Sequence, residues 1–183
     1  ACPLTMKTSR LETLVVHGGE QRPPAERAVA MPIYQSSTFV ISGEGSDYHD
    51  IRYMRLNNTP NHEVLHRKLA LLEGTEAAVV TASGMAAITT ALLALLSAGD
   101  HVIAQDCLYG GTHDFFVKDF PALGLDVSFL APASPDSWDA LVKPRTKMVY
   151  VEAVTNPLLR VIDLERVVAF ARKHRLLAVI DNT

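Results

Sequence analysis

The sequence predicts an α/β protein whose domain is a doubly wound, mostly parallel sheet, preceded by an extended N-terminal arm. Three features indicate this fold class. From residue 77 onward, apolar runs of strand length alternate with segments of helical periodicity, and the connections between them are short. Most of the runs are apolar at both alternating sets of positions. Strands with this pattern are covered by helices on both faces, as in parallel sheets.

The first segments of the chain form the arm. Residues 9–12 (SRLE) have the capping-box pattern that begins a helix, and Gly18 and Gly19 follow where it would end. Residues 20–58 show little periodicity and are interrupted by prolines and glycines. Because a long irregular segment is unusual inside a compact domain, we expect it to contact a neighbouring subunit. The chain is thus divided into an arm, residues 1–58, and the first part of a domain, residues 59–183.

The domain is expected to begin with a helix. Thr59 and Pro60 have the pattern of a cap and a first helical position, and Gly74 marks the end of the helix. Four apolar residues at helical spacing form its expected buried stripe: Val64, Leu65, Leu69 and Leu72.

Residues 76–100 are the stretch around which the domain is organised. Residues 77–80 (AAVV) suit a buried strand, and the chain turns at Ser83 and Gly84. Apolar residues then recur at helical spacing, at 85, 88, 92, 95 and 96, before Gly99. A helix that follows a strand in this way points unpaired N–H groups, and the positive end of its dipole, beyond the strand. This predicts an anion site, typically for a phosphate. The alternative is an ordinary βα turn whose glycine permits close packing.

Strands and helices alternate to the end of the sequence. Strands are expected at residues 101–106, 126–130, 147–152 and 176–181, and helices at 112–123, 135–142 and 164–174. Ligands of such sheets bind beyond the carboxyl ends of the strands. The segments at that edge are residues 83–85, 107–112, 152–156 and 181–183.

This edge combines a phosphate cradle with the ring of Tyr109, the amide of Asn156 and the carboxylates of Glu152 and Asp181. The set suits a flat, phosphorylated ring that contains nitrogen. Each residue also has a plainer interpretation, with Tyr109 on the rim of the domain and each carboxylate paired with an arginine or capping a helix. Cys107, beside this turn, is either a reactive thiol or a small core residue.

The composition fits a water-soluble globular protein of about one domain, with 183 residues, 48% hydrophobic and 20% charged. A net charge of −3 without a basic run argues against nucleic acid or an anionic membrane as a partner. The longest apolar run, residues 91–96, is too short to span a bilayer, and no secretory leader is recognisable. Two cysteines without framework spacing indicate a reduced, cytoplasmic protein.

Eight segments, in order along nearly the whole chain, resemble one enzyme family. They are residues 17–19 (HGG), 34–39 (YQSSTF), 53–55 (YMR), 72–74 (LEG), 83–88 (SGMAAI), 108–112 (LYGGT), 152–157 (EAVTNP) and 181–183 (DNT). In combination, they resemble the pyridoxal 5'-phosphate (PLP) enzymes of cysteine and methionine metabolism. These are the cystathionine γ-synthase, γ-lyase and β-lyase group, with their sulfhydrylase and methionine γ-lyase relatives. The resemblance implies an incomplete PLP-binding domain of the aspartate-aminotransferase type.

The resemblance also implies which residues bind the cofactor phosphate. Gly84 and Met85, with Ser83, would bind it through backbone N–H groups. Tyr53 and Arg55 would reach it from the neighbouring subunit, in a homo-oligomer that is a dimer of dimers. Arginine suits this role because its planar fork matches phosphate oxygens.

Further residues would contact the ring of the cofactor. By the resemblance, Tyr109 would stack on the pyridine ring, and Asp181, next to Thr183, would keep the ring nitrogen protonated. A protonated ring is an electron sink. Asn156 would lie near the 3-oxygen of the ring, with Glu152 beside it in a supporting role on the substrate side.

By the same resemblance, the reaction would be elimination or replacement at the β or γ carbon of a sulfur-containing or O-acylated amino acid. A lysine that carries the cofactor would remove the α proton. In the family this lysine follows the segment that matches residues 181–183. The six lysines of the chain match no such position: Lys7, Lys68, Lys118, Lys143, Lys147 and Lys173. We therefore expect that the chain is about half of a family member and does not bind the cofactor covalently by itself.

Three departures from the family pattern bear on the substrate. Residues 55–60 (RLNNTP) change the usual order Arg-x-x-Asn-Pro-Thr, and residues 152–156 (EAVTN) lack the usual proline. Gly111 stands where methionine γ-lyases carry a cysteine, which favours the cystathionine enzymes. Asp114 stands where cystathionine γ-lyases carry an arginine, and an aspartate favours an amine on the substrate. A methionine γ-lyase and an O-acetylhomoserine sulfhydrylase stay as alternatives.

Two alternatives belong to other classes. Residues 62–66 (HEVLH) have the H-E-x-x-H pattern of zinc peptidases, with both histidines on one helix face and Glu63 as a base. No third ligand follows at zincin spacing, so a solvent-facing stripe is the competing interpretation. The other alternative is a folding or assembly fragment without activity. No G-x-G-x-x-G segment indicates a nicotinamide cofactor.

Overall fold

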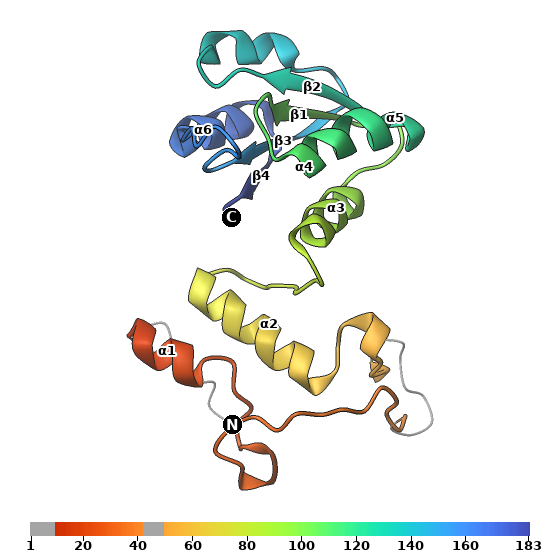
Figure 1. Ribbon diagram of the computed structural model, residues 1–183, viewed down its shortest axis with the longest axis vertical. Helices are drawn as coiled ribbons and strands as arrows, with labels where there is room; N and C mark the ends of the chain where they lie inside the picture. Colours follow the sequence, from red (N-terminus) through yellow and green to blue (C-terminus); the bar gives the residue numbers. More distant parts are fainter. Residues whose placement is uncertain (1–9, 42–49) are drawn as a thin grey trace. The chain divides into compact units, whose positions relative to one another are not determined.

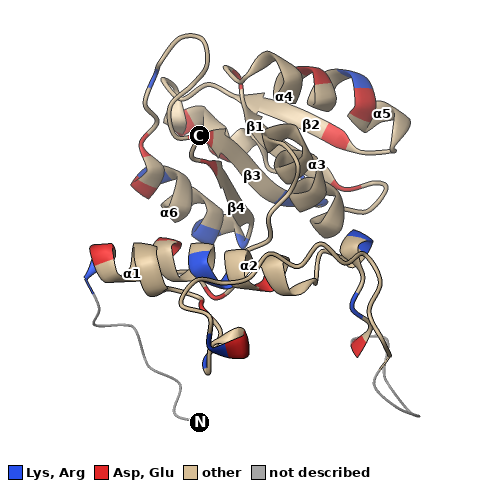
Figure 2. Ribbon diagram, turned by 60° about the horizontal axis from the view of Figure 1, so that its bottom comes forward, with Lys and Arg blue, Asp and Glu red and all other residues tan. Residues whose placement is uncertain are grey.

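The computed structural model describes residues 10–41 and 50–183. The chain forms two compact units, one up to Thr81 and one from Ala82 onward, and each is described by itself. Ser9, the predicted cap of the first helix, and Lys7 lie outside the described residues. Within the described ranges, no helix is long and apolar enough to cross a membrane. Lys and Arg are interspersed with Asp and Glu along the ribbon (Figure 2). The proposed boundary between residues 58 and 59 stays a prediction.

The first unit contains helices and irregular segments, as predicted. Its helices are α1 (Leu11–His17), α2 (Pro60–Glu73) and the 3-10 turns η2 (Ala25–Arg27) and η4 (Met54–Leu56). Lys68 Nζ donates hydrogen bonds of 3.1 Å to the carbonyls of Val15 and Val16 at the end of α1. Gly19 has a φ of +73°, and a Cβ there would lie 2.5 Å from the backbone nitrogen of Lys68. Glycine therefore lets the chain pass directly against α2.

The bounds predicted for α2 are confirmed. Thr59 is its N-cap, Pro60 its first residue, and Gly74 ends it in the left-handed region with a φ of +64°. The Thr59 hydroxyl contacts His62 Nδ1 at 2.7 Å. Of the predicted stripe, Leu65 is exposed, while the other three residues are half-buried.

The strand predicted at residues 77–80 is wrong. The segment is extended, but within the described residues it pairs with no strand, and Val79 is 69% exposed. The physical reason is that a strand requires a hydrogen-bonded neighbour, whereas an apolar run only indicates the tendency to be buried.

The second unit contains a four-stranded parallel sheet in the order β2-β1-β3-β4. The strands are β1 (His101–Gln105), β2 (Asp126–Leu130), β3 (Thr146–Glu152) and β4 (Leu177–Asp181). Each agrees with its prediction within one residue at either end. The parallel α/β fold class is therefore confirmed, and the carboxyl ends of all four strands lie at one edge.

Helices cover both faces of this sheet. They are α3 (Gly84–Leu95), α4 (Gly110–Asp114), α5 (Phe120–Ala122) and α6 (Leu164–His174). Along β3, Met148 and Tyr150 join one hydrophobic cluster, with residues of α3, of α5 and of the segment 115–119 that precedes α5. Val149 and Val151 join the other cluster, with α6. Figure 1 shows α6 on one side of the sheet and α4 and α5 on the other. This alternation explains why the strands are apolar at all positions.

The helix predicted at residues 112–123 is present, with an interruption. A π-helical segment, η5 (Phe115–Asp119), lies between α4 and α5. Pro121 has no N–H to continue the α-helical pattern, and a π turn precedes it. The helix predicted at 135–142 is the 3-10 segment η6 (Pro135–Leu141), whose Trp138 is buried and donates from Nε1 to the carbonyl of Ala131 at 3.0 Å.

We expect His101 to make the second unit less stable at mildly acidic pH. Its ring is buried between the Thr146 and Ser128 hydroxyls, and burial lowers the pKa of the imidazole below 6.5, with the nearby Lys143 acting in the same direction. The unfolded chain then binds the proton more readily, so the free energy of unfolding should fall as the pH drops from about 7 to about 5. Denaturant unfolding of a His101→Gln variant should show a shallower pH dependence in that range. An unchanged slope would contradict the assignment. The carboxyl of Asp126 acts in a separate window below 3.8, because its hydrogen bond with Lys143 lowers its pKa.

Candidate functional site

A cavity of about 270 Å³ lies beyond the carboxyl ends of β3 and β4. It combines the start of α3 with the segments that follow β1, β3 and β4. Its lining residues are Gly84, Met85, Ile88, Tyr109, Glu152, Val154, Asn156, Asp181 and Thr183. The structure thus brings together all four segments that the sequence placed at this edge.

The start of α3 forms one wall of the cavity. Ser83 is its N-cap, and its hydroxyl accepts a 3.1 Å hydrogen bond from the backbone N–H of Ala86. The N–H groups of Gly84 and Met85 have no carbonyl four residues earlier within the helix, as is usual in a first turn. A Cβ at Gly84 would meet no atom within 4 Å. The helix start therefore offers backbone donors and room for a ligand group close to them.

Glu152 holds two sides of the cavity together. The side chain is 4% exposed at the end of β3, where Oε1 accepts from the backbone N–H of Tyr109 at 2.7 Å. Its Oε2 accepts from the backbone N–H of Asn156 at 3.2 Å. One buried carboxylate thus fixes the turns that carry Tyr109 and Asn156. Both of its oxygens accept hydrogen bonds from backbone N–H groups.

Asp181 is the second carboxylate of the site. Its Oδ1 accepts from the backbone N–H of Thr183 at 3.0 Å and from the Thr183 hydroxyl at 2.6 Å. Its Oδ2 accepts from the Tyr150 hydroxyl at 3.2 Å. Burial, and secondarily the charge of Asp181, raises the pKa of Tyr150 well above its usual range. The tyrosine therefore remains a hydrogen-bond donor at neutral pH.

The Tyr109 ring lies close to the backbone of Gly111, which in turn lies close to Met85 of α3. Its side chain is 48% exposed, and a Cβ at Gly111 would lie 2.7 Å from its Cε1 atom and 3.2 Å from Met85 Sδ. The buried Thr112 hydroxyl lies 3.8 Å from the same sulfur. The ring can hold this position only because residue 111 has no side chain.

A Gly111→Ala substitution is expected to displace the Tyr109 ring without unfolding the domain, because the exposed ring can move aside. Gly110→Ala is the matched control, since a Cβ at Gly110 would meet no atom within 4 Å. Quenching of tyrosine fluorescence by iodide should increase for Gly111→Ala only, while both melting temperatures stay within a few degrees of wild type. Equal behaviour of the two variants would contradict the contact.

The remaining predicted site residues are Asp114, Tyr53 and Arg55, the last two predicted to act from a neighbouring subunit. Asp114 does not line the cavity and forms an exposed ion pair of 2.6 Å with Lys118. Tyr53 and Arg55 belong to the first unit, where the Arg55 guanidinium carbon lies 4.3 Å from the centre of the Tyr53 ring. The unusual turn after Arg55 has Asn57 in the left-handed region. The Asn58 side chain closes this turn by accepting from the Tyr53 N–H at 2.8 Å.

The H-E-x-x-H segment forms no metal site within the described residues. His62 Nδ1 contacts the Thr59 hydroxyl, and Glu63 forms a 3.2 Å ion pair with Arg52. His66 Nε2 is buried without a hydrogen-bond partner, and the burial lowers the pKa of its imidazole. No group of three or more possible metal ligands occurs among the described residues, so the third ligand that a zinc peptidase needs is missing there.

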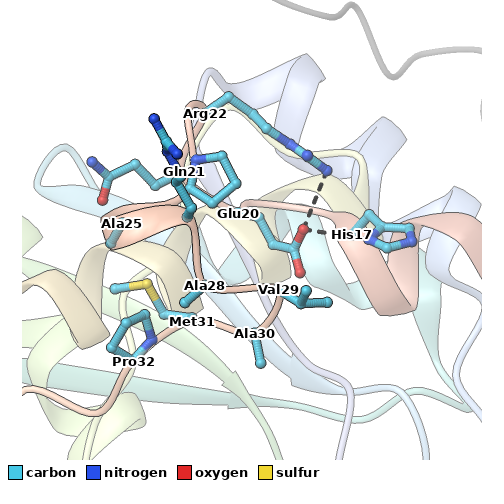
Figure 3. Close-up of a pocket in the computed structure, with 12 residues that line it drawn as sticks. His17, Glu20, Gln21, Arg22, Ala25, Ala28, Val29, Ala30, Met31 and Pro32 are labelled. Carbon is cyan, nitrogen blue, oxygen red and sulfur yellow. Dashed lines mark hydrogen bonds and ion pairs between the residues drawn. The ribbon is translucent and has the colours of Figure 1, made fainter.

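A separate cavity of about 220 Å³ lies in the first unit among residues 17–32 (Figure 3). Its most prominent charged group is Glu20, whose Oε2 lies 3.3 Å from both His17 Nδ1 and Arg22 Nη2. Glu20 and Arg22 form an ion pair there, and Arg27 is a further charged residue of the lining. No residue predicted to bind the cofactor lines this cavity, so it is a weaker candidate than the cavity at the sheet edge.

Sequence reasoning missed Tyr150 and Gln105. Tyr150 was interpreted only as part of a buried strand, although it precedes Glu152 by two residues and so shares its face of β3. Gln105 is buried, and its Oε1 accepts from the Glu152 N–H at 3.1 Å. Both are polar residues within otherwise apolar strands. Because buried polar groups generally have hydrogen-bond partners, this pattern could have indicated that each bonds to a neighbouring polar group.

Comparison with known proteins assigns the family. The sequence profile of the family described as Cys/Met metabolism PLP-dependent enzyme matches residues 12–183. The chain belongs to this family. Over 171 residues it is 39% identical to the "Probable cystathionine gamma-synthase" of Herpetosiphon aurantiacus, a match that covers 93% of this chain and 53% of the relative. The resemblance seen in the sequence is therefore confirmed at the level of the family.

Solved structures of the family agree with the fold. The cystathionine gamma-lyase of Lactobacillus plantarum, complexed with L-serine, has a TM-score of 0.84 and 34% identity, covering 95% of this chain and 45% of that one. A Campylobacter jejuni protein described as O-acetylhomoserine (thiol)-lyase, solved with N'-pyridoxyl-lysine-5'-monophosphate, has a TM-score of 0.85 and 29% identity. It matches 95% of this chain and 44% of its own. The family is PLP-dependent, and this chain spans about half the length of these relatives.

Proposed function

We propose that the chain is the front part of the cofactor domain of a PLP-dependent enzyme that acts on a sulfur-containing or O-acylated amino acid. The reaction is elimination or replacement at the β or γ carbon. The observation that carries the proposal is a single cavity that joins the start of α3 to Tyr109 and Asp181. Among the described lysines, none lines this cavity.

The residues present fit the cofactor. Gly84 and Met85 would hold its phosphate at the first turn of α3, a 12-residue helix whose dipole favours an anion. Asp181 would hold the ring nitrogen, because it lines the same cavity and carries a carboxylate. Tyr109 and Asn156 would border the ring, held in place by Glu152. When bound, PLP supplies an electron sink for the negative charge that develops at the α carbon of the substrate.

The residues of this chain orient the cofactor and provide the charges that act on it. Asp181, as a carboxylate, stabilises a proton on the ring nitrogen, and Tyr150 and Thr183 fix its orientation. Gly84 and Met85 bind and orient the phosphate end of the cofactor. Tyr109 covers one side and excludes water from it. In the proposed homo-oligomer, Tyr53 and Arg55 complete the phosphate site of a neighbouring subunit. A dimer of dimers and a cytoplasmic location stay predictions.

Within the family, the cystathionine-type reactions are favoured over methionine γ-lyase. Gly111 stands where methionine γ-lyases carry a cysteine, and a Cβ at this position would lie 2.7 Å from Cε1 of the Tyr109 ring as it is placed here. Asp114 remains the predicted contact for an amine of the substrate. Its exposed pair with Lys118 would have to open for this role.

Calorimetric titration of the chain with pyridoxamine 5'-phosphate tests the proposal. This compound has the ring and phosphate of PLP but cannot react with surface lysines. We expect saturable 1:1 binding, and much weaker binding of pyridoxamine, which lacks the phosphate. Equal affinity for both compounds, or no binding at all, would contradict the proposal.

A further inference from the structure

Tyr150 belongs to the hydrophobic core of the second unit. Tyr150 is 1% exposed on β3, and its ring packs edge-on against Phe116 at a centroid distance of 5.4 Å. The hydroxyl donates to Asp181 Oδ2 across the parallel β3–β4 pair, in which Glu152 is aligned with Asp181. A phenylalanine would fill the same core space without this bond. The hydroxyl is therefore the part of the side chain that acts on Asp181.

The hydrogen bonds at Asp181 are unequal between its two oxygens. Each carboxylate oxygen has about two acceptor sites. Both sites of Oδ1 are used, by the backbone N–H and the hydroxyl of Thr183. Within the part of the chain that the structure describes, Oδ2 receives one donor, Tyr150, and so retains one acceptor site.

We infer that Tyr150 is a positioning residue that holds Asp181 Oδ2 as the atom that accepts the ring N–H of the cofactor. The inference rests on the proposed function. Two donors then share Oδ2, and the carboxylate is locked in rotation by Thr183 on one side and Tyr150 on the other. Since burial raises the pKa of Tyr150, the hydroxyl stays a donor throughout the neutral range.

The test is a double-mutant cycle on pyridoxamine 5'-phosphate affinity, with wild type, Tyr150→Phe, Asp181→Asn and the double variant. Tyr150→Phe keeps the ring that packs on Phe116 and should weaken binding about tenfold, as expected for a lost hydrogen bond to a charged group. In the Asp181→Asn background it should cause a much smaller loss, because the carboxylate charge that Tyr150 orients is already gone. A second readout is the ring ¹⁵N chemical shift of labelled pyridoxamine 5'-phosphate, which should differ between wild type and Tyr150→Phe.

The outcomes separate the inference from the proposed function. Wild-type affinity and an unchanged ¹⁵N shift in Tyr150→Phe, with weak binding only in Asp181→Asn, would overturn the role of Tyr150 and leave the cofactor site intact. An equal loss in both backgrounds would show a general packing effect and would also overturn it. Failure of the wild-type chain to bind would overturn both. Thermal unfolding of Tyr150→Phe within a few degrees of wild type verifies that the domain is folded.

Discussion

Replacing Asp181 with asparagine is expected to weaken the binding of pyridoxamine 5'-phosphate about 100-fold, because a charge-assisted hydrogen bond becomes a neutral one. The neutral amide also no longer stabilises a proton on the ring nitrogen. Asparagine has nearly the same shape, so the fold should persist. Calorimetric titration measures the change in affinity directly. The loss of affinity should be greatest at a pH at which the ring nitrogen is protonated.

The matched control for this substitution is Asp126→Asn. Asp126 lies at the amino end of β2, outside the cavity, where it forms a 2.6 Å ion pair with Lys143. The Asp126→Asn variant loses the same charge from the same sheet, but outside the cavity. Its affinity for pyridoxamine 5'-phosphate should therefore stay at the wild-type value. If the two variants bind equally well, Asp181 does not contact the ring.

Replacing Glu152 with glutamine should affect both stability and binding. Glutamine keeps one oxygen, but its NH₂ group then faces either the Tyr109 N–H or the Asn156 N–H, which loses its acceptor. A buried donor without a partner costs about 1–3 kcal/mol, and the lost charge adds to this, so the free energy of unfolding should fall by about 3 kcal/mol. The affinity for pyridoxamine 5'-phosphate should fall about tenfold, because both turns that border the ring lose their anchor.

Denaturant unfolding and calorimetric titration of the same protein separate the two effects of Glu152→Gln. Glu165→Gln, an exposed change in the first turn of α6, is the control and should alter neither quantity by much. A Glu152 variant that unfolds as wild type does would show that the two backbone hydrogen bonds do not hold the turns.

The sheet could be predicted from the sequence because its strands are buried on both faces. β2 and α6 match their predicted bounds. A turn at Gly124 precedes the strand and a turn at Arg175 follows the helix, and the apolar pattern of each segment fits only that type of element. Residues 77–80 have the same composition and form no strand, because pairing depends on a neighbour that composition does not reveal. Leu95 was expected on the buried face of α3 and is exposed, as it is the last residue of that helix.

The candidate site was predictable as a set of segments and much less so as a set of contacts. In a parallel sheet, the residues at and after the carboxyl end of each strand meet at one edge, so the sequence alone predicts that Tyr109, Asn156 and Asp181 lie together. The partners of each carboxylate depend on side-chain directions. Sequence therefore left open whether Glu152 and Asp181 bind arginines, and the structure shows backbone and hydroxyl donors instead.

The most direct measurement of the cofactor site is a ¹H–¹⁵N NMR titration of the chain with pyridoxamine 5'-phosphate. The site predicts the largest amide shift changes at Gly84, Met85, Tyr109 and Thr183, all on one saturation curve. Saturable binding that leaves these four amides unchanged, or that shifts residues 17–32 most, would contradict the placement of the cofactor at the carboxyl edge of the sheet.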